Sequence, residues 1–336
     1  MDSVTHIVLG ACIGELIAGK RLGKKAMLLG AIAQSIPDVD FVASFWMDTT
    51  SDLLAHRGFT HSILFTLLLS PLLGFVSKKW QRKTNLSLWN WTMFWGIQIF
   101  IHIFIDSFNA YGTGWLEPFS HQRFTFNTLF VADPLFIIWP LISAVVLLVL
   151  KRNNAKRRGW AVAGVACCSL YLVYCIYNKL HIDKVVSKAI ENQHIRNNKW
   201  FTTPSPLNCM LWFVVIENDS GYHIGYHCVF DKKDKLELRY VLRNDPLLKP
   251  LEGNKELRDL KRFSRGYYTA EMWHDTLVFN DLCFEDMAGW QNPDAKFVFH
   301  YYLLPPGAND IVVQRGRFAG WGNGAVLALL QRIKGN

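Results

Sequence analysis

Residues 88–107 read LWNWTMFWGIQIFIHIFIDS, an apolar run that ends in a histidine and an aspartate. A helix of this length reaches about 30 Å, which is the thickness of the hydrocarbon core of a bilayer. His102 and Asp106 are four residues apart, so a helix places both on one face, about one turn from each other. Ionisable side chains at membrane depth are costly unless they line a site, and we therefore expect a functional site here.

Other parts of the first 180 residues have the same character. The long apolar runs, which predict four membrane-spanning helices, are residues 60–77, 88–107, 134–150 and 160–178. Two shorter runs, 4–19 and 25–36, have a helical rhythm and are compatible with a span, a tilted helix or a half-buried one. We predict a polytopic helical membrane domain of about six helices over residues 1–180.

Basic residues gather in every second loop between these helices. They are Lys20, Arg21, Lys24 and Lys25, then Lys78, Lys79, Arg82 and Lys83, then Lys151, Arg152, Lys156, Arg157 and Arg158. The positive-inside rule makes these loops cytoplasmic and the C-terminal domain extracytoplasmic. Much of the net charge of +9 is then a topology signal. We expect membrane lipid as a partner and no nucleic acid.

The histidines and acids of the helical half share one end of the predicted helices. They are His6, Asp38, Asp40, His56, His61, His102 and Asp106. On the predicted topology all of them lie on the outer side, whereas a chance arrangement would scatter them over both sides. Histidine and carboxylate together suit a divalent metal, with zinc favoured and manganese or iron as alternatives.

Local sequence features support this site. Pro37 disfavours helix at the residue before it and leaves Asp38 at an exposed turn. Gly58 permits a bend in HRGFTHS (residues 56–62) that would aim its two histidines inward. Arg57 carries a fork of donors suited to a phosphate or carboxylate beside the metal.

Taken singly, each of these residues has an ordinary interpretation, such as an interfacial histidine, a helix cap or a solvated loop acid. A functional site is favoured because all of these residues lie on the same side of the predicted membrane domain. One acid is left out of it, because Asp133 followed by Pro134 is typical of an N-cap and the first residue of a helix.

The predicted chemistry is hydrolysis by a metal-activated water, since a bound divalent ion lowers the pKa of water to about 7. The candidate metal ligands are His6, Asp38, His56, His61, His102 and Asp106, and the candidate catalytic residues are Asp38, Asp40 and Arg57. A position at the outer membrane interface favours a lipid or lipid-linked ester or phosphoester as substrate. An ion- or proton-coupled transporter and a non-catalytic membrane scaffold are the alternatives, because buried histidines and acids also mark ion pathways.

The second half of the chain is mixed in polarity, charged and rich in turns. We predict a connecting helix at 181–200, with a Pro-containing linker at 202–206, and a β-rich extracytoplasmic domain over 201–336. Its strand-like runs are LWFVVIE (211–217), YHIGYHCVF (222–230), LELRYVL (236–242), GYYTAEMW (266–273), LVFNDLCF (277–284) and KFVFHYYLL (296–304).

Residues 218–221 and 273–276 predict turns between neighbouring strands, and a helical insertion is expected near 251–265. His223 and His227 have no second set of ligands in the sequence and are expected at the surface. The predicted fold class is α+β, with helical membrane and antiparallel β-rich parts.

The chain resembles the bacterial membrane-bound metal-dependent hydrolases, a family with members regulated by the LexA repressor. The segments that carry the resemblance are Thr5-His6, Pro37–Asp40, HRGFTHS (56–62), HIFID (102–106) with Tyr111-Gly112-Thr113, Thr203–Pro206 and Gly221-Tyr222. It covers nearly the full length and implies a protein of the bacterial inner membrane with metal-dependent hydrolase activity. The site is also similar, more distantly, to those of zinc-dependent phospholipases C and P1-type nucleases.

Overall fold

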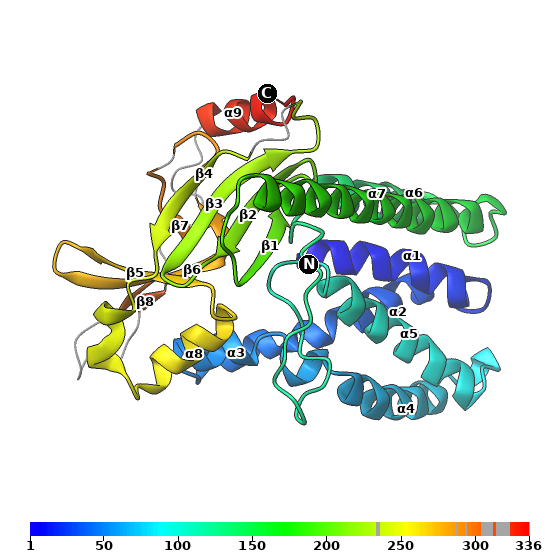
Figure 1. Ribbon diagram of the computed structural model, residues 1–336. Helices are drawn as coiled ribbons and strands as arrows, with labels where there is room; N and C mark the ends of the chain where they lie inside the picture. The colour runs from blue at the N-terminus through cyan, green and yellow to red at the C-terminus, as the bar shows by residue number, and fades with distance from the viewer. Residues whose placement is uncertain (233–235, 287, 293, 304–311, 314–322, 336) are drawn as a thin grey trace. The chain divides into compact units, whose positions relative to one another are not determined.

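A computed structural model of the chain contains a helical and a β-rich region (Figure 1). It describes residues 1–232, 236–286, 288–292, 294–303, 312–313 and 323–335. The chain divides into two compact units. The helical unit comprises Met1–Val42, Ala55–Cys175 and Pro206–Asn208, and the β unit comprises Ala43–Leu54, Ile176–Ser205 and Cys209–Asn336. The predicted fold class, apolar helices followed by antiparallel sheets, is confirmed.

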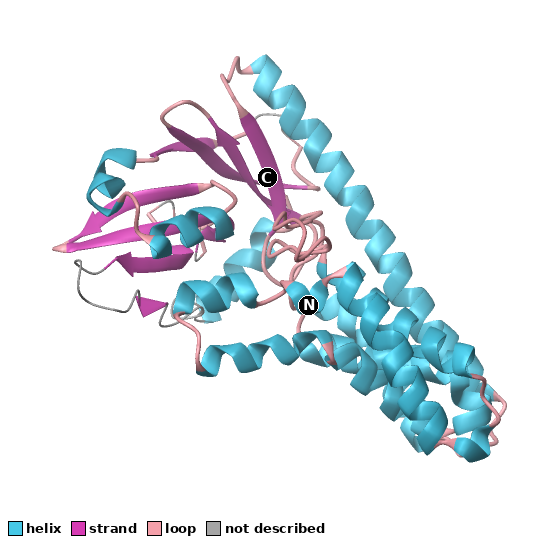
Figure 2. Cartoon of the chain, turned by 90° about the horizontal axis from the view of Figure 1, so that it is seen from below, coloured by secondary structure: helices cyan, strands magenta, loops and turns pink. Residues whose placement is uncertain are grey.

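Each of the six predicted helical runs coincides with a helix, and the helices of the helical unit pack side by side (Figures 1 and 2). They are α1 (Ser3–Leu22), α2 (Lys24–Ser35), α4 (Ile63–Trp80), α5 (Leu88–Asp106), α6 (Pro134–Val149) and α7 (Lys156–Asn192). The shorter elements η1 (Pro37–Phe45), α3 (Thr49–Ala55) and η2 (Phe59–His61) connect α2 to α4, and η3 (Arg82–Thr84) precedes α5.

Side-chain caps begin four of these helices, and Asp2 caps α1 by accepting a hydrogen bond from the amide of Thr5. Ser62 accepts a hydrogen bond from the amide of Phe65, and Ser87 caps α5 in the same way. Asp133 accepts from the first amides of α6, with Pro134 as the first helical residue, as predicted. These caps satisfy amides that have no partner inside their own helix.

The contact between α1 and α2 requires glycine. A Cβ on Gly10 would lie 2.4 Å from the carbonyl oxygen of Gly30, and one on Gly14 would lie 2.2 Å from that of Ala26. Small residues let helix backbones approach closely inside a membrane, where dispersion contacts and hydrogen bonds hold helices together. The other side of α2 packs on α5, through Trp91, Phe94 and Trp95.

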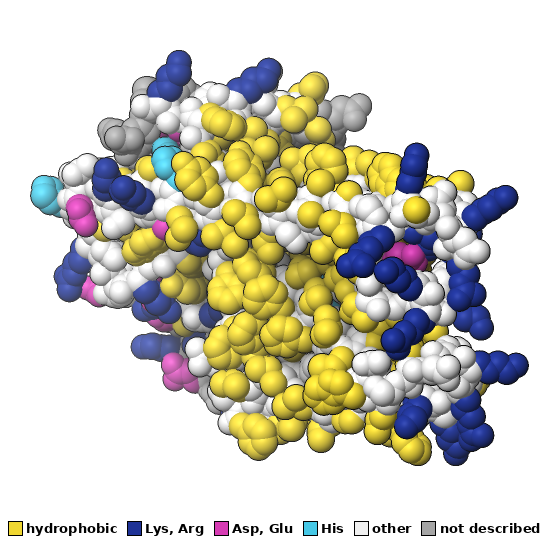
Figure 3. Space-filling view, turned by 90° about the vertical axis from the view of Figure 1, so that its right-hand side faces the viewer, with side chains coloured by type: hydrophobic (Ala, Val, Ile, Leu, Met, Phe, Trp, Pro, Cys, Tyr) yellow, Lys and Arg dark blue, Asp and Glu magenta, His cyan; other side chains and the backbone are white. Residues whose placement is uncertain are grey.

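Several helices expose apolar surface that water would not tolerate. Only 22% of the apolar window of α4, and likewise of α7, is buried. Figure 3 shows one face on which hydrophobic side chains form a broad area, with Lys and Arg side chains gathered along its right-hand edge. Apolar surface of this extent on long helices indicates contact with lipid.

Among the described residues, four helices are long and apolar enough to cross a membrane, namely α1, α4, α5 and α7. The pair α2 and η1, bent by 52°, would make a fifth span. The run 134–150, predicted as a span, forms α6, whose 16 residues fall short of the usual length. The sequence left open whether the run 4–19 is long enough to span. It forms α1, which reaches 20 residues because the helix continues through Lys20 and Arg21.

The β unit contains two four-stranded antiparallel sheets, each with its strands in sequence order. Their strands are β1 (Lys199–Pro204), β2 (Leu211–Glu217), β3 (Gly221–Cys228) and β4 (Leu238–Leu242), then β5 (Tyr268–Trp273), β6 (Thr276–Asp286), β7 (Phe297–Leu303) and β8 (Val312–Val313). Every predicted strand-like run overlaps one of these strands, although Leu304 lies outside the described residues. The remaining elements are η4 (Asp245–Leu251), α8 (Lys255–Phe263) and α9 (Asn323–Arg332).

One apolar core joins the two sheets of this unit. It includes Phe213 and Tyr222 from the first sheet and Leu282 and Phe297 from the second. All seven residues of β2 are buried, because the first sheet is also covered on its other side. There Asn178 of α7 donates to the carbonyl oxygen of Cys209 at 3.0 Å.

The connection between the halves differs from the prediction in two places, although residues 181–192 are helical as expected. The helix expected at 181–200 is the last part of α7, which continues unbroken to Asn192 because no proline interrupts it. The linker expected at 202–206 overlaps the second half of strand β1, where Thr202 pairs with Val214 of β2.

Candidate metal centre

Four residues from three separate elements bring ligand atoms to one point in the helical unit. Asp38 comes from η1, His61 from η2, and His102 and Asp106 from α5, and their ligand atoms all lie within 4.8 Å of one another. His102 Nε2 lies 3.4 Å from Asp38 Oδ1 and 3.8 Å from Asp106 Oδ2. His61 Nε2 lies 3.6 Å from each of the same two carboxylate oxygens.

The ends of short elements aim these side chains. The helix α2 stops at Ser35 before Pro37, so the carbonyl oxygen of Gln34 is among those that the helix leaves without an internal partner. His102 Nδ1 donates to this oxygen at 2.5 Å, which leaves a lone pair on Nε2. On the opposite side, His61 Nδ1 lies 3.3 Å from Asp40 Oδ2. A hydrogen bond on one ring nitrogen orients the other toward a metal.

Asp106 is held by a set of buried cationic and donor groups. His6 Nε2 lies 3.0 Å from Oδ1, and the amino group of Met1 also contacts this oxygen. Arg57 Nε lies 3.3 Å from Oδ2, the oxygen that faces the two histidines. The ring of His6 stacks on that of His102 with centroids 3.7 Å apart. His6 therefore adjoins the group of four and contacts two of its members.

Asp40 contacts several groups next to the four candidate ligands. Its Oδ2 accepts from the backbone amide of Arg57 at 2.7 Å and from the hydroxyl of Thr60 at 3.0 Å. Its Oδ1 lies 3.0 Å from His56 Nδ1. His56 is outside the group of four, and 38% of its side chain is exposed. The structure thus separates the two histidines of HRGFTHS, with His61 at the centre and His56 toward solvent.

The sharp bend in this motif falls one residue earlier than expected. Arg57 has φ 61°, in the left-handed region that is strained for a residue with a side chain, whereas Gly58 has φ −86°. The loop after α5 stabilises the bend, because Gly114 donates to the carbonyl oxygen of Arg57 at 2.9 Å. Arg123 from the same loop donates to the carbonyl oxygen of His56 at 2.8 Å.

The charge of the cluster favours a cation at its centre. Burial disfavours the charged form of His61, but the nearby carboxylates of Asp106, Asp38 and Asp40 outweigh it and raise the pKa of His61 to about 9. A protonated, positively charged His61 ring would balance the negative charge of the carboxylates. A bound divalent metal would balance it as well.

The donor set fits a divalent metal by two observations. His61 Nε2 and His102 Nε2 lie 3.1 Å apart, and two nitrogens bound to one zinc in a tetrahedral site would lie about 3.3 Å apart. Asp106 Oδ2 is buried and accepts no hydrogen bond from the described residues. This oxygen forms an ion pair with Arg57 and also faces the two imidazole nitrogens, where a carboxylate oxygen could serve as a metal ligand.

The sequence did not point to the groups that orient the ligands. The carbonyl oxygen of Gln34 and the side chain of Asn109 are examples, the latter accepting from Arg57 Nη1 at 2.7 Å. A backbone carbonyl carries no residue-type signal, and an isolated asparagine in a loop is too common to suggest a role. Thr60 does lie inside HRGFTHS, but its hydroxyl could equally have capped a helix.

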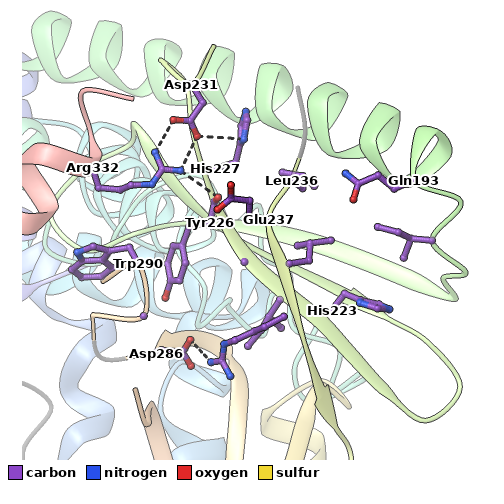
Figure 4. Close-up of a pocket in the computed structure, with 16 residues that line it drawn as sticks. Gln193, His223, Tyr226, His227, Asp231, Leu236, Glu237, Asp286, Trp290 and Arg332 are labelled. Carbon is purple, nitrogen blue, oxygen red and sulfur yellow. Dashed lines mark hydrogen bonds and ion pairs between the residues drawn. The ribbon is translucent and has the colours of Figure 1, made fainter. Parts of the chain in front are cut away.

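The β unit contains a separate pocket of about 790 Å³ (Figure 4). His227, expected at the surface, is buried there with Nδ1 3.4 Å from Asp231, which forms a 2.6 Å ion pair with Arg332 of α9. The prediction is wrong because Asp231 follows β3 in a turn and Arg332 comes from the far end of the chain. His223 is half-buried at the same pocket.

Comparisons with known proteins agree with a membrane location. The model of the family described as YdjM inner membrane protein matches residues 1–182. "Inner membrane protein YbcI" of Escherichia coli (strain K12) is 29% identical over 123 residues, which cover 36% of this chain and 69% of that protein. "Uncharacterized protein YfhP" of Bacillus subtilis (strain 168) is 29% identical over 239 residues, which cover 67% and 68%.

No solved structure shows significant similarity to the chain. The family match covers all four residues of the metal-ligand cluster and more than half of the sequence. Together with the exposed apolar helices, it identifies a membrane protein that belongs to the YdjM inner membrane protein family.

Proposed function

We propose that this protein is a multi-pass, metal-dependent hydrolase of the inner membrane that cleaves an ester or phosphoester of a lipid or lipid-linked molecule. The observation that carries the proposal is the convergence of Asp38, His61, His102 and Asp106 within 4.8 Å. These four residues would hold the ion, and zinc fits the two imidazoles and two carboxylates well. When bound, a divalent ion acts as a Lewis acid and lowers the pKa of water to about 7.

The side from which a substrate would enter follows from burial. The side chains of His61, His102 and Asp106 are fully buried, whereas 20% of the Asp38 side chain is exposed. Val39 and Phe41, in the same element η1 as Asp38, expose apolar side chains. So does Phe59 in η2, the element that carries His61. A polar centre with apolar residues at its open side suits an amphiphilic substrate better than a small hydrophilic one.

His56 would move the proton. Its Nδ1 contacts Asp40, so the carboxylate fixes the ring and leaves Nε2 on the exposed side. The ring centroid lies 6.3 Å from that of His61, which puts His56 beside the ligands without making it one of them. A histidine oriented by an aspartate is the usual arrangement of a general base, and Nε2 would accept the proton released in hydrolysis.

Arg57 would stabilise negative charge. Its guanidinium is buried, is held by Asn109 and Asp106, and lies over the ring of Tyr111 at 4.9 Å. It therefore needs no reorganisation to act on a developing oxyanion close to Asp106, and such fixed charge is an effective source of transition-state stabilisation. Asp40 contributes by orienting both His56 and His61.

The test uses the detergent-purified full chain, a generic phosphodiester and a generic ester, and then a membrane lipid extract. We expect turnover that needs the metal and is lost in His102→Ala. His56→Gln should keep the metal but lower turnover and remove one limb of the pH–rate profile. His121→Gln, an exposed histidine outside the centre, is the matched control. Stoichiometric metal without turnover of any lipid fraction would reduce the centre to a structural site.

A transporter is the second candidate, because one observation favours it. Gln34 donates to Gln98 at 2.9 Å, and Gln98 donates to the carbonyl oxygen of Gly10 at 3.1 Å, which makes a second polar layer inside the bundle. The backbones of α1 and α2 touch at this level, however, and the space between Gly10 and Gly30 does not admit even a methyl group. Proton or cation flux in proteoliposomes would favour transport over hydrolysis.

A further inference from the structure

A second pocket of about 720 Å³ opens in the helical unit, at the end of α1 that carries the loops to α2. It is bounded by the last turns of α1, by the start of α5 and by the loop between α6 and α7. All of its lining residues belong to the helical unit. Its position at the end of apolar helices is the level at which lipid headgroups lie.

The floor of this pocket is a buried ion pair whose net charge is zero. Arg157 Nε donates to Glu15 Oε1 at 2.8 Å and Nη2 donates to Oε2 at 2.7 Å, and both side chains are buried. Arg157 Nη1 also donates to the carbonyl oxygens of Leu147 and Leu150, at the end of α6. The floor is thus a bidentate, fully engaged pair that shapes the pocket without adding net charge.

The rim is strongly positive. Glu15 is the one acid among the described lining residues, and Arg157 neutralises it. The remaining ionised lining groups are Lys20, Arg21, Arg152 and Arg158, all of them exposed. Four exposed cations around one concavity make its electrostatic potential positive and favour an anion there.

The walls are apolar. Ile17, Met93 and Phe94 line the pocket between its cationic rim and the body of the bundle. A free inorganic anion would gain nothing from these side chains, whereas the glycerol and acyl part of a lipid would. A zwitterionic headgroup would bring its own cation against the four on the rim.

We propose that this pocket binds the phosphate headgroup of an anionic membrane phospholipid. The phosphate would lie among Lys20, Arg21, Arg152 and Arg158, and an acyl chain would follow the apolar wall beside Ile17. This pocket is at the basic loops and shares no residue with the metal-ligand cluster. The proposal does not depend on hydrolase activity. On the predicted topology the lipid belongs to the cytoplasmic leaflet, where basic residues near a membrane meet anionic lipid.

The test compares two double variants of the full chain in a neutral detergent. Lys20→Gln with Arg158→Gln removes two rim charges. Lys78→Gln with Lys79→Gln removes two exposed charges that lie, like Lys20, in the last turn of a helix but outside the pocket. Phosphatidylglycerol and phosphatidylcholine are titrated separately, and bound lipid is counted by native mass spectrometry. Inorganic phosphate is the water-soluble probe.

We expect wild type and the control pair to retain phosphatidylglycerol in preference to phosphatidylcholine. The rim variant should bind phosphatidylglycerol about thirtyfold more weakly, since each basic residue near an anionic lipid contributes about a factor of five. Lys20→Arg with Arg158→Lys should restore binding and guards against a folding defect. Equal binding of the two lipids, or an equal loss in the control pair, would overturn the proposal. Displacement of the lipid by millimolar inorganic phosphate would reassign the pocket to a soluble phosphate.

Discussion

The Nε2 atoms of His61 and His102 lie 3.1 Å apart, although the residues are 41 positions apart in the chain and belong to different elements. Each ring is turned by a partner on its other nitrogen, Asp40 for His61 and the Gln34 carbonyl oxygen for His102. Two lone pairs held this close repel each other unless a proton or a metal ion lies between them. This relationship makes the two nitrogens suitable to share a bound metal ion.

Metal removal should therefore lower stability. In His102→Ala we expect loss of the bound ion and a lower thermal unfolding midpoint, because a ligand present at a hundred times its Kd stabilises the native state by about 2.7 kcal/mol. Elemental analysis and thermal unfolding of wild type, His102→Ala and the control His121→Ala would check this. Equal metal content in the three proteins would remove His102 from the site.

Replacement of Arg57 separates charge from geometry. Arg57→Lys keeps the positive charge but loses the fork that contacts both Asp106 and Asn109. We expect metal content to stay at the wild-type level while turnover falls by at least about tenfold, the order of effect for one transition-state contact. Arg82→Lys, in the short η3 element, is the control. Loss of metal together with activity would instead make Arg57 a positioning residue for Asp106.

Topology can be tested with reporters that are active only outside the cytoplasm. We expect activity for a fusion after Asn198 and silence for a fusion at Arg82, because the basic loops should remain inside. Asn198 is a suitable junction since α7 ends at Asn192 and β1 begins at Lys199, so neither element is cut. Activity at Arg82 and silence at Asn198 would invert the membrane orientation and place the metal centre on the cytoplasmic side.

The buried pair of Glu15 and Arg157 offers a test of packing. Arg157→Met leaves a buried carboxylate without its partner and should cost about 3–5 kcal/mol of stability. Combining it with Glu15→Gln should recover part of that loss, because no unpaired charge then remains. Lys156→Met, at the neighbouring exposed position, should be nearly neutral. Thermal unfolding in one detergent would check all three; a double variant no better than the single one would contradict the pairing.

The β unit should lose stability as pH rises. Burial raises the pKa of Asp281 to about 7, and its Oδ2 has no hydrogen-bond partner among the described residues. Because the folded pKa is above the unfolded value of about 3.9, the contribution is fully present below that value and is lost as pH rises through about 7. Asp281→Asn should raise the unfolding midpoint at pH 8 and flatten the profile between pH 4 and 7. An unchanged slope would mean that Asp281 stays charged when buried.

The sequence by itself determined the fold class and a set of six candidate ligands that includes the four residues at the centre. Apolar runs of bilayer length, the periodicity of the strands and the Asp133-Pro134 start of α6 are local signals, and each survives in the structure. The spacing of His102 and Asp106 also sufficed to put them on one helix face, because helix geometry is set by the backbone.

Tertiary structure alone decided which histidines meet. His56 and His61 are equivalent in the sequence motif, yet only His61 joins Asp38, His102 and Asp106, because the left-handed turn at Arg57 directs the two rings apart. The orienting oxygen of Gln34 exists only because α2 ends there and packs against α5. Contacts between distant elements depend on packing, and neither composition nor periodicity encodes them.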